Sequence, residues 1–133
     1  MKRRCPRATA LGLATLKGFR LEFRKFVTIE PDAAGTVTGA LYELTPACLR
    51  ALEIYEGSDY AKQDVTIETA SGPQKAMAFV MTGGERAPPT LPYFGEIARG
   101  YTDWKLDHAT LRRARIATLH ETKPLRKLLK PTP

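Results

Sequence analysis

The chain has 133 residues, of which 43% are hydrophobic and 26% are charged, and its formal net charge is +7. These proportions are close to the averages of globular proteins and exclude a disordered chain, and the length suits one domain. A membrane protein is excluded because no stretch approaches the ~18 apolar residues of a spanning helix. Lys17 ends the first apolar run before a secretory signal is complete, so we expect a cytoplasmic protein.

Basic residues gather at both ends of the chain. Residues 1–25 hold 8 Lys and Arg against 1 acid and residues 110–133 hold 7 against 1, whereas residues 26–109 hold 6 against 12. Nucleic acid would therefore meet only the ends, where no platform of aromatic side chains accompanies the basic residues. We do not expect nucleic acid to be the partner. The candidate phosphate contacts near the C-terminus are Arg112, Arg113, Arg115, Arg126 and Lys127.

The first half of the chain predicts two strands. Apolar residues alternate with basic ones over residues 14–26, which predicts a half-buried strand, and Gly18 predicts a bulge within it. Residues 28–35 contain a proline, an aspartate and a glycine, so we expect a loop there. Residues 36–44 predict a second strand, in which Gly39 leaves room for a backbone or ligand to approach closely.

The clearest local signal is a helix over residues 45–55. Thr45 is a good N-cap, Pro46 suits the first helical position, and Gly57 offers a stop. Alternation over residues 60–69 and 75–82 then predicts a hairpin.

The second half closes with an irregular segment and two helices. Residues 83–92 are rich in glycine and proline and predict an irregular crossing, and residues 93–101 predict a short packing helix. A further helix is expected from Asp107 until Pro124 breaks it. Together these elements predict a small mixed α+β fold, a partly closed β-barrel with a few short helices. We expect one domain over residues 1–120 and a basic, flexible tail over residues 121–133.

The cysteines give no sign of a metal site. Cys5 and Cys48 form no CxxC pair, and only His108 and His120 could help them to bind a metal. We therefore expect free thiols and no metal.

Glu56 is the candidate catalytic residue. It continues the helical spacing of Cys48 and Leu52, so its side chain points the way the core does. It also lies at the helix C-terminus, where the macrodipole disfavours an anion. Both features predict a raised pKa for this carboxyl, which suits a general base near neutral pH. A carboxylate that turns to solvent at a frayed helix end is the alternative that periodicity leaves open.

Three segments in order carry a resemblance to a known family: residues 39–44 (GALYEL), 52–60 (LEIYEGSDY) and 87–93 (APPTLPY). With this spacing the chain resembles the γ-glutamylcyclotransferase-like family, also called avirulence-induced-gene-like, over about residues 5–108. In that family a strand leads into a helix that ends in Glu-Gly, the next strand begins with Tyr, and a proline-rich segment ending in Tyr follows later.

The resemblance implies site residues position by position. Glu56 takes the place of the catalytic glutamate, and Tyr60, Tyr93 and Gly57 take substrate-binding positions. Ordinary amphipathic packing, with the hydroxyl reaching water, stays open for both tyrosines. Some relatives have a tyrosine where this chain has Phe79, so one polar contact of those relatives is absent here.

The resemblance also implies the reaction. The α-amino group of a γ-glutamyl compound attacks its own side-chain carbonyl and releases 5-oxoproline together with an amine or amino acid, as in glutathione metabolism. The activity is that of a transferase or lyase, and no metal or organic cofactor is required. Free γ-glutamyl amino acids, γ-glutamyl amines and a γ-glutamyl protecting group are all compatible substrates.

The family's N-terminal Y-G-S-N loop has no counterpart in this sequence. In relatives its backbone amides cradle the γ-glutamyl group, so we expect the chain as it stands to be weakly active or inactive. A catalytically inactive family member that acts as a binding or regulatory module is the alternative. An unfilled sheet edge would also allow a homodimer by strand exchange.

Overall fold

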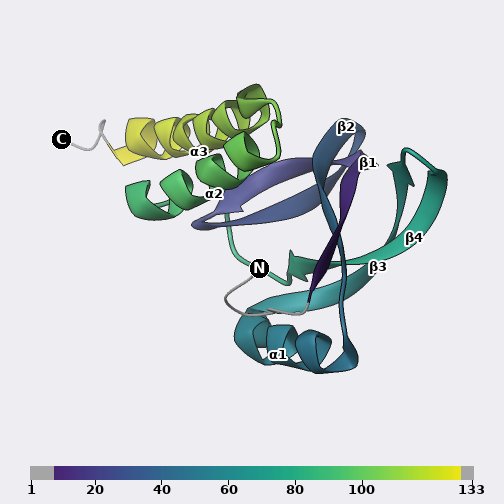
Figure 1. Ribbon diagram of the computed structural model, residues 1–133. Coiled ribbons are helices and arrows are strands. Elements are labelled where there is room, and N and C mark those ends of the chain that lie inside the picture. Colours follow the sequence, from purple (N-terminus) through teal and green to yellow (C-terminus); the bar gives the residue numbers. More distant parts are fainter. Residues whose placement is uncertain (1–7, 130–133) are drawn as a thin grey trace.

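The computed structural model describes the backbone of residues 8–129 and the side chains of residues 8–119. Two β-hairpins flank a first helix, and two further helices complete the chain (Figure 1). The elements are β1 Thr9–Arg24, β2 Phe26–Glu43, α1 Pro46–Glu56, a 3-10 turn at Gly57–Asp59, β3 Tyr60–Thr69, β4 Gly72–Met81, α2 Leu91–Asp103 and α3 His108–Leu129.

The four strands form one antiparallel sheet in the order β2-β1-β3-β4. The two hairpins are joined at a single register pair, Thr15 with Glu68, and they diverge from there. The sheet is not closed, although the Met81 N–H donates to the Thr28 hydroxyl oxygen at 2.9 Å and so brings one end of β4 to the start of β2. The α+β class expected from the sequence is confirmed, and the sheet is an open, curved one.

The loop predicted for residues 28–35 is wrong. The chain turns earlier, at Lys25, whose φ of 68° lies in the left-handed region, and β2 begins at the next residue. The irregular segment predicted for residues 83–92 stabilises this turn through two backbone hydrogen bonds. The Lys25 N–H donates to the Ala87 carbonyl at 2.9 Å, and the Ala87 N–H donates to the Phe23 carbonyl at 3.0 Å.

The residues expected to form that loop make a wide bulge in β2 instead. Between the register pairs of Lys17 and Phe19, β1 skips one residue, Gly18, whereas β2 skips residues 32–35. The bulge predicted at Gly18 is therefore confirmed. A Cβ atom on Gly35 would lie 2.2 Å from the Phe19 carbonyl oxygen, so only glycine fits where the bulge crosses β1.

Helix α1 is built as the sequence predicts. The Thr45 hydroxyl oxygen accepts a hydrogen bond from the Cys48 N–H at 3.1 Å, and Pro46 occupies the first turn. Gly57 ends the helix with a φ of 63°, and its N–H donates to the Glu53 carbonyl.

We expect Thr45→Ala to lower the free energy of unfolding by about 1 kcal/mol, because one N–H of the first turn loses its acceptor. Urea denaturation followed by circular dichroism measures the loss. Thr45→Ser keeps the hydroxyl and should stay close to the wild type. Equal losses in the two variants would mean that the threonine methyl, not the cap, stabilises the helix.

The β3–β4 hairpin and α2 are confirmed, and the end predicted for α3 is wrong. The helix passes Pro124 and continues to Leu129. A proline removes only one backbone hydrogen bond from a helix, and the leucine- and lysine-rich residues that follow it have high helix propensity. Residues 130–133 of the predicted tail and Cys5 lie outside the described residues.

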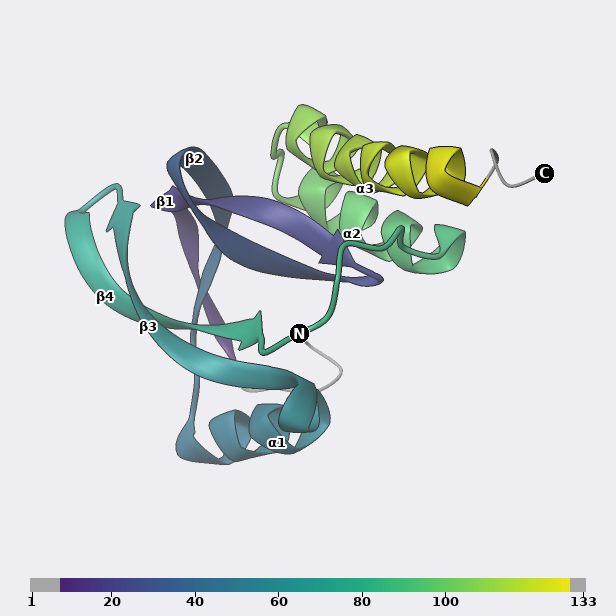
Figure 2. The same ribbon diagram turned by 180° about the vertical axis from the view of Figure 1, so that it is seen from behind.

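Two apolar clusters lie at opposite sides of the hairpins. Phe23 and Leu111 are fully buried where α2 and α3 pack against the β1–β2 hairpin, whereas Cys48 and Leu52 hold α1 against Phe79. Figure 2 shows α2 and α3 side by side next to the β1–β2 hairpin, with α1 on the other side of the molecule. None of the helices in the described part of the chain is long and apolar enough to cross a membrane.

Candidate active site

Glu56 is the last residue of α1 and is half-buried. The residues two and one turns before it on the same face, Cys48 and Leu52, are buried, whereas Glu53 and Tyr55 are exposed. The apolar stripe predicted from the sequence therefore exists, and Glu56 continues it at the end of the helix.

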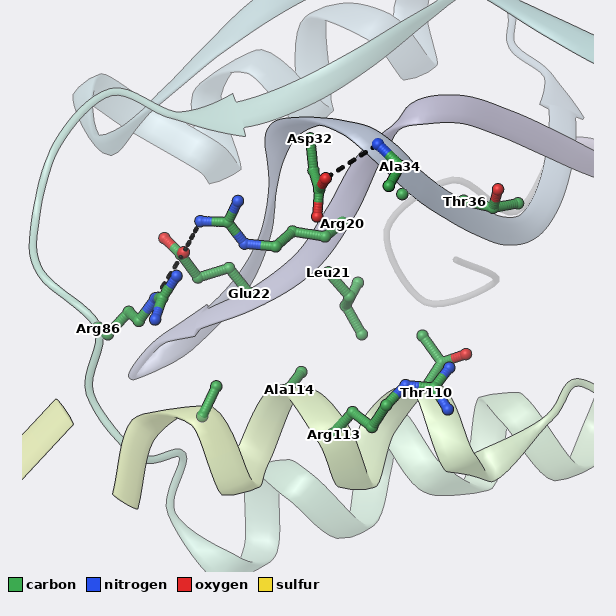
Figure 3. A pocket seen from close by; sticks show the side chains of 12 residues that line it. Arg20, Leu21, Glu22, Asp32, Ala34, Thr36, Arg86, Thr110, Arg113 and Ala114 are labelled. Carbon is green, nitrogen blue, oxygen red and sulfur yellow. Dashed lines mark hydrogen bonds and ion pairs between the residues drawn. The ribbon is translucent and has the colours of Figure 1, made fainter. Parts of the chain in front are cut away.

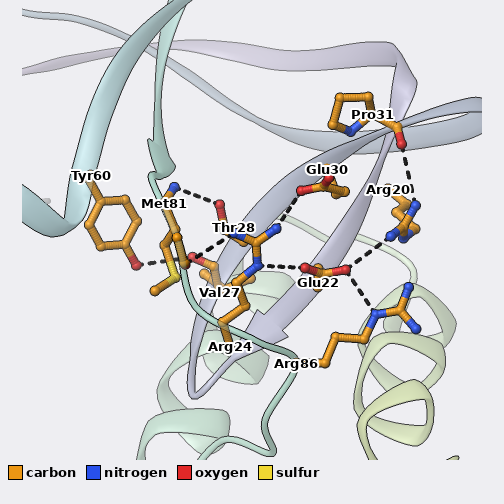
Figure 4. Close-up of polar contacts among 11 residues, drawn as sticks. Arg20, Glu22, Arg24, Val27, Thr28, Glu30, Pro31, Tyr60, Met81 and Arg86 are labelled. Atoms are coloured by element: carbon orange, nitrogen blue, oxygen red, sulfur yellow. Dashed lines mark hydrogen bonds and ion pairs between the residues drawn. The ribbon is translucent and has the colours of Figure 1, made fainter. Parts of the chain in front are cut away.

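Two tyrosine hydroxyls meet on one backbone residue, Val27, just after the β1–β2 turn. Tyr60, the first residue of β3, donates from its hydroxyl to the Val27 carbonyl at 3.2 Å (Figure 4). Tyr93, in the first turn of α2, accepts from the Val27 N–H at 3.0 Å. Because the Tyr93 oxygen is the acceptor there, its own hydroxyl proton is not used in this hydrogen bond.

The charge of Glu56 contributes to the pKa shifts of both tyrosine hydroxyls. Burial, then the neighbouring charges of Tyr93 and Glu56, raises the pKa of Tyr60 to about 12. Burial also raises the pKa of Tyr93; the hydrogen bond from Val27 opposes this shift, and the Glu56 charge adds to it. We call Glu56, Tyr60 and Tyr93 the Glu56 cluster. Its tyrosines are neutral hydrogen-bond donors at physiological pH, and Glu56 is the group that can carry a charge.

The surroundings of this cluster are acidic. Besides Glu56, Asp59 and Tyr55 act on the Tyr60 hydroxyl, and Glu96 acts on Tyr93, and all of them raise the pKa values. The negative charges of Asp59 and Glu96 add to that of Glu56 and favour a cation such as an ammonium group at this site.

Gly57 lets the chain leave helix α1 directly after Glu56. Its φ of 63° and ψ of −152° form a combination that residues with a side chain rarely adopt. The glycine therefore has a conformational role, and contact between Gly57 and a substrate stays a prediction.

Phe79 belongs to the packing beneath α1. It is half-buried against Cys48 and Leu52, in the apolar cluster that holds the helix on the β3–β4 hairpin. Its ring therefore supports the helix that carries Glu56, and it brings no polar group toward the carboxylate.

A buried ionic network that was not expected from the sequence lies beside this site. The buried Glu22 accepts from Arg24 at 2.6 Å, from Arg86 at 3.0 Å and from Arg20 at 3.1 Å, and Arg24 also pairs with Glu30 (Figure 4). Burial alone would raise the pKa of Glu22, but the hydrogen bonds from the three arginines outweigh it and hold the pKa below its usual value.

A sequence signal for this network was present. Arg20, Glu22 and Arg24 are spaced by two along one strand, so they share one face of β1. That face was expected to meet solvent, but the crossing segment with Arg86 covers it.

The family is decided by comparison with known proteins. The sequence model of the family described as "Gamma-glutamyl cyclotransferase, AIG2-like" matches residues 1–106. The chain belongs to this family. Comparison with curated proteins finds no match.

Solved structures share the γ-glutamyl cyclotransferase fold with this chain. One described as "Gamma-glutamyl cyclotransferase" has a TM-score of 0.75 at 22% identity, and the likeness covers 85% of this chain and 76% of that one. An uncharacterized protein from Homo sapiens has a TM-score of 0.75 at 23% identity with the same coverage. An uncharacterized protein from Pyrococcus horikoshii has a TM-score of 0.54 at 20% identity and covers 77% of this chain and 85% of that one. At these identities the likeness shows the fold alone.

This member of the γ-glutamyl cyclotransferase family contains, within its described side chains, no group of three or more His, Cys, Asp or Glu residues that could hold a metal ion. The Glu56 cluster itself offers a carboxylate and two phenol hydroxyls.

Proposed function

We propose that the chain is a γ-glutamyl cyclotransferase in which Glu56 is the general base and acid. The observation that carries the proposal is the Glu56 cluster: a half-buried carboxylate whose charge acts on two tyrosine hydroxyls brought together at Val27. Membership of the γ-glutamyl cyclotransferase family supports the same chemistry. The substrate is a small γ-glutamyl compound.

The reaction is an intramolecular aminolysis. The α-amino group of the γ-glutamyl unit is an ammonium ion at neutral pH, so it must lose a proton before it can attack. Glu56 takes this proton, a bond forms between the amino nitrogen and the side-chain carbonyl carbon, and the bond from that carbon to the leaving amine breaks. Glu56 then gives the proton to the leaving amine nitrogen. The ring nitrogen, which after the attack still carries two hydrogens and a positive charge, loses one of them, and the released amine takes it up and departs as an ammonium ion, leaving 5-oxoproline.

The electrostatics of the site suit the first step. Glu56 and the neighbouring acids favour the substrate's ammonium group in the ground state, and the proton has a carboxylate within the same cluster to receive it. Tyr60 and Tyr93 are neutral at physiological pH and position the γ-glutamyl chain by hydrogen bonding. Ring closure needs no second reactant, so holding the chain folded supplies much of the acceleration.

Release of 5-oxoproline tests this proposal. We expect the chain as it stands to release little, because a family-type Y-G-S-N loop is absent from its sequence, and a version extended upstream with such a segment to release much more. Chromatographic detection of 5-oxoproline, with γ-glutamyl amino acids and γ-glutamyl amines as separate substrates, gives the rate and the substrate class. A folded extended chain that releases nothing from any of them would overturn the proposal.

The second candidate is a family member that binds a γ-glutamyl compound without cyclising it. Phe79 favours it, because the ring is committed to packing beneath α1 and offers no hydroxyl. Saturable binding of a γ-glutamyl ligand to the extended chain without release of 5-oxoproline would select this candidate.

A further inference from the structure

A cavity of about 430 Å³ lies between the β1–β2 hairpin and the first turns of α3 (Figure 3). No member of the Glu56 cluster lines it. Arg20, Glu22 and Asp32 line it from the hairpin, Arg86 from the crossing segment and Arg113 from α3.

Short side chains on both walls create the space. Helix α3 presents Thr110, Ala114 and Ala117 along one face, at spacings of four and three residues. The opposite wall is the wide bulge of β2, where Ala34 and Gly35 add almost no side-chain volume. The cavity therefore exists because the bulge and the small-residue face of the helix oppose each other.

Two guanidinium groups of the lining are held in fixed positions. Arg20 and Arg86 donate to the same oxygen of the buried Glu22, at 3.1 and 3.0 Å, which anchors one edge of each guanidinium. A guanidinium has five N–H donors, so an anchored arginine retains donors for a ligand. Figure 3 shows the side chains of Arg20, Glu22 and Arg86 gathered on the hairpin side of the cavity.

Arg113 contributes positive charge from the other wall. Its exposed side chain makes no hydrogen bond or ion pair with the side chains and backbone of residues 8–119. Arg115, on the same helix, is engaged elsewhere, 4.8 Å from the centre of the Phe94 ring. The lining holds three arginines against the acids Glu22 and Asp32, and Glu22 is already surrounded by arginines.

We propose that this cavity binds a small molecule through its oxyanion, a carboxylate or a phosphate group, between Arg113 and the anchored guanidinium groups of Arg20 and Arg86. Planar guanidinium groups match such oxyanions with paired hydrogen bonds. The hydroxyls of Thr36 and Thr110 add donors to the lining. The volume falls within the range of about 300–1,000 Å³ that is typical of small-molecule sites. This site is independent of the proposed cyclotransferase activity.

Amide chemical shifts of the full chain test the proposal. Inorganic phosphate and succinate are titrated separately at constant ionic strength, with chloride as the non-bonding anion. We expect saturable shifts of the amides of Gly35, Thr36 and Thr110 with phosphate, succinate or both, and none with chloride. The anion that saturates first identifies the oxyanion class.

A pair of neighbouring arginines supplies the matched variants. Arg113→Ala should weaken the anion at least about tenfold, equivalent to ~1.4 kcal/mol, whereas Arg112→Ala should not, because Arg112 is exposed and does not line the cavity. Both variants remove one exposed charge from the same helix, so neither should unfold the chain. Equal weakening by both, or shifts that chloride reproduces, would overturn the proposal.

Discussion

Glu56→Gln should reduce release of 5-oxoproline by about 10²- to 10⁴-fold, the usual contribution of a general acid-base residue. Glutamine keeps the shape of the side chain but cannot take a proton from the substrate's ammonium group. The fold should be unaffected, because the side chain is only half-buried and lies at a helix C-terminus, where an anion is slightly unfavourable. Turnover is measured in whichever chain, as it stands or extended, shows release.

Glu53→Gln is the matched control for this prediction. It changes the same residue type on the same helix, but Glu53 is exposed and pairs with Lys62 at 3.1 Å on the surface. A surface pair contributes little, so turnover and melting temperature should both stay close to the wild type. If Glu56→Gln lowered turnover no more than Glu53→Gln, Glu56 would not be the base.

The parts of the fold that were predicted correctly depend on local chemistry. The N-cap Thr45, the first-turn Pro46 and the terminal Gly57 act on their own helix, so their roles follow from the sequence alone. The turn at Lys25 could not be found in this way, because it contains neither glycine nor proline and is held by Ala87 from far along the chain. Residues 32–35, which were predicted as part of a loop, form the bulge in β2. Turns and bulges favour the same residue types, so the sequence does not distinguish between them.

In the candidate site, too, the features set by local sequence were predicted and those set by distant contacts were not. The position of Glu56 at the end of the buried stripe of α1 follows from helical spacing, so the sequence predicts it. Tyr60 from β3 and Tyr93 from α2 both hydrogen-bond to the backbone of Val27 in β2. The sequence around Val27 contains no local pattern that predicts these contacts. The network at Glu22 was missed because alternation along β1 predicts one solvent-facing side, whereas both Glu22 and Phe23 are buried.

Glu22→Gln should lower the free energy of unfolding by about 3 kcal/mol at neutral pH, because it removes a buried carboxylate that three arginines share. Breaking a buried ion pair typically costs ~3–5 kcal/mol, and the lower end applies here. The side chains of Arg20 and Arg86 are 37% and 30% exposed, so water replaces part of what they lose. Glu30→Gln is the control, since Glu30 is 37% exposed and, among residues 8–119, pairs with Arg24 alone.

The pH dependence distinguishes the ion network from simple packing. The pKa of Glu22 is below its usual value of 4.5 in the folded chain, so the unfolded chain takes up the proton first as pH falls. The stability that Glu22 contributes is therefore complete above pH ~4.5 and is lost as pH falls through the folded pKa. Urea denaturation of the wild type and of Glu22→Gln between pH 7 and pH 3 gives the free energy of unfolding of each. The difference between the two should be constant above pH ~5 and become smaller in the acid range, because glutamine resembles a protonated glutamate. If the difference in free energy of unfolding were the same at pH 3 as at pH 7, Glu22 would stabilise the fold by its shape and not by its charge.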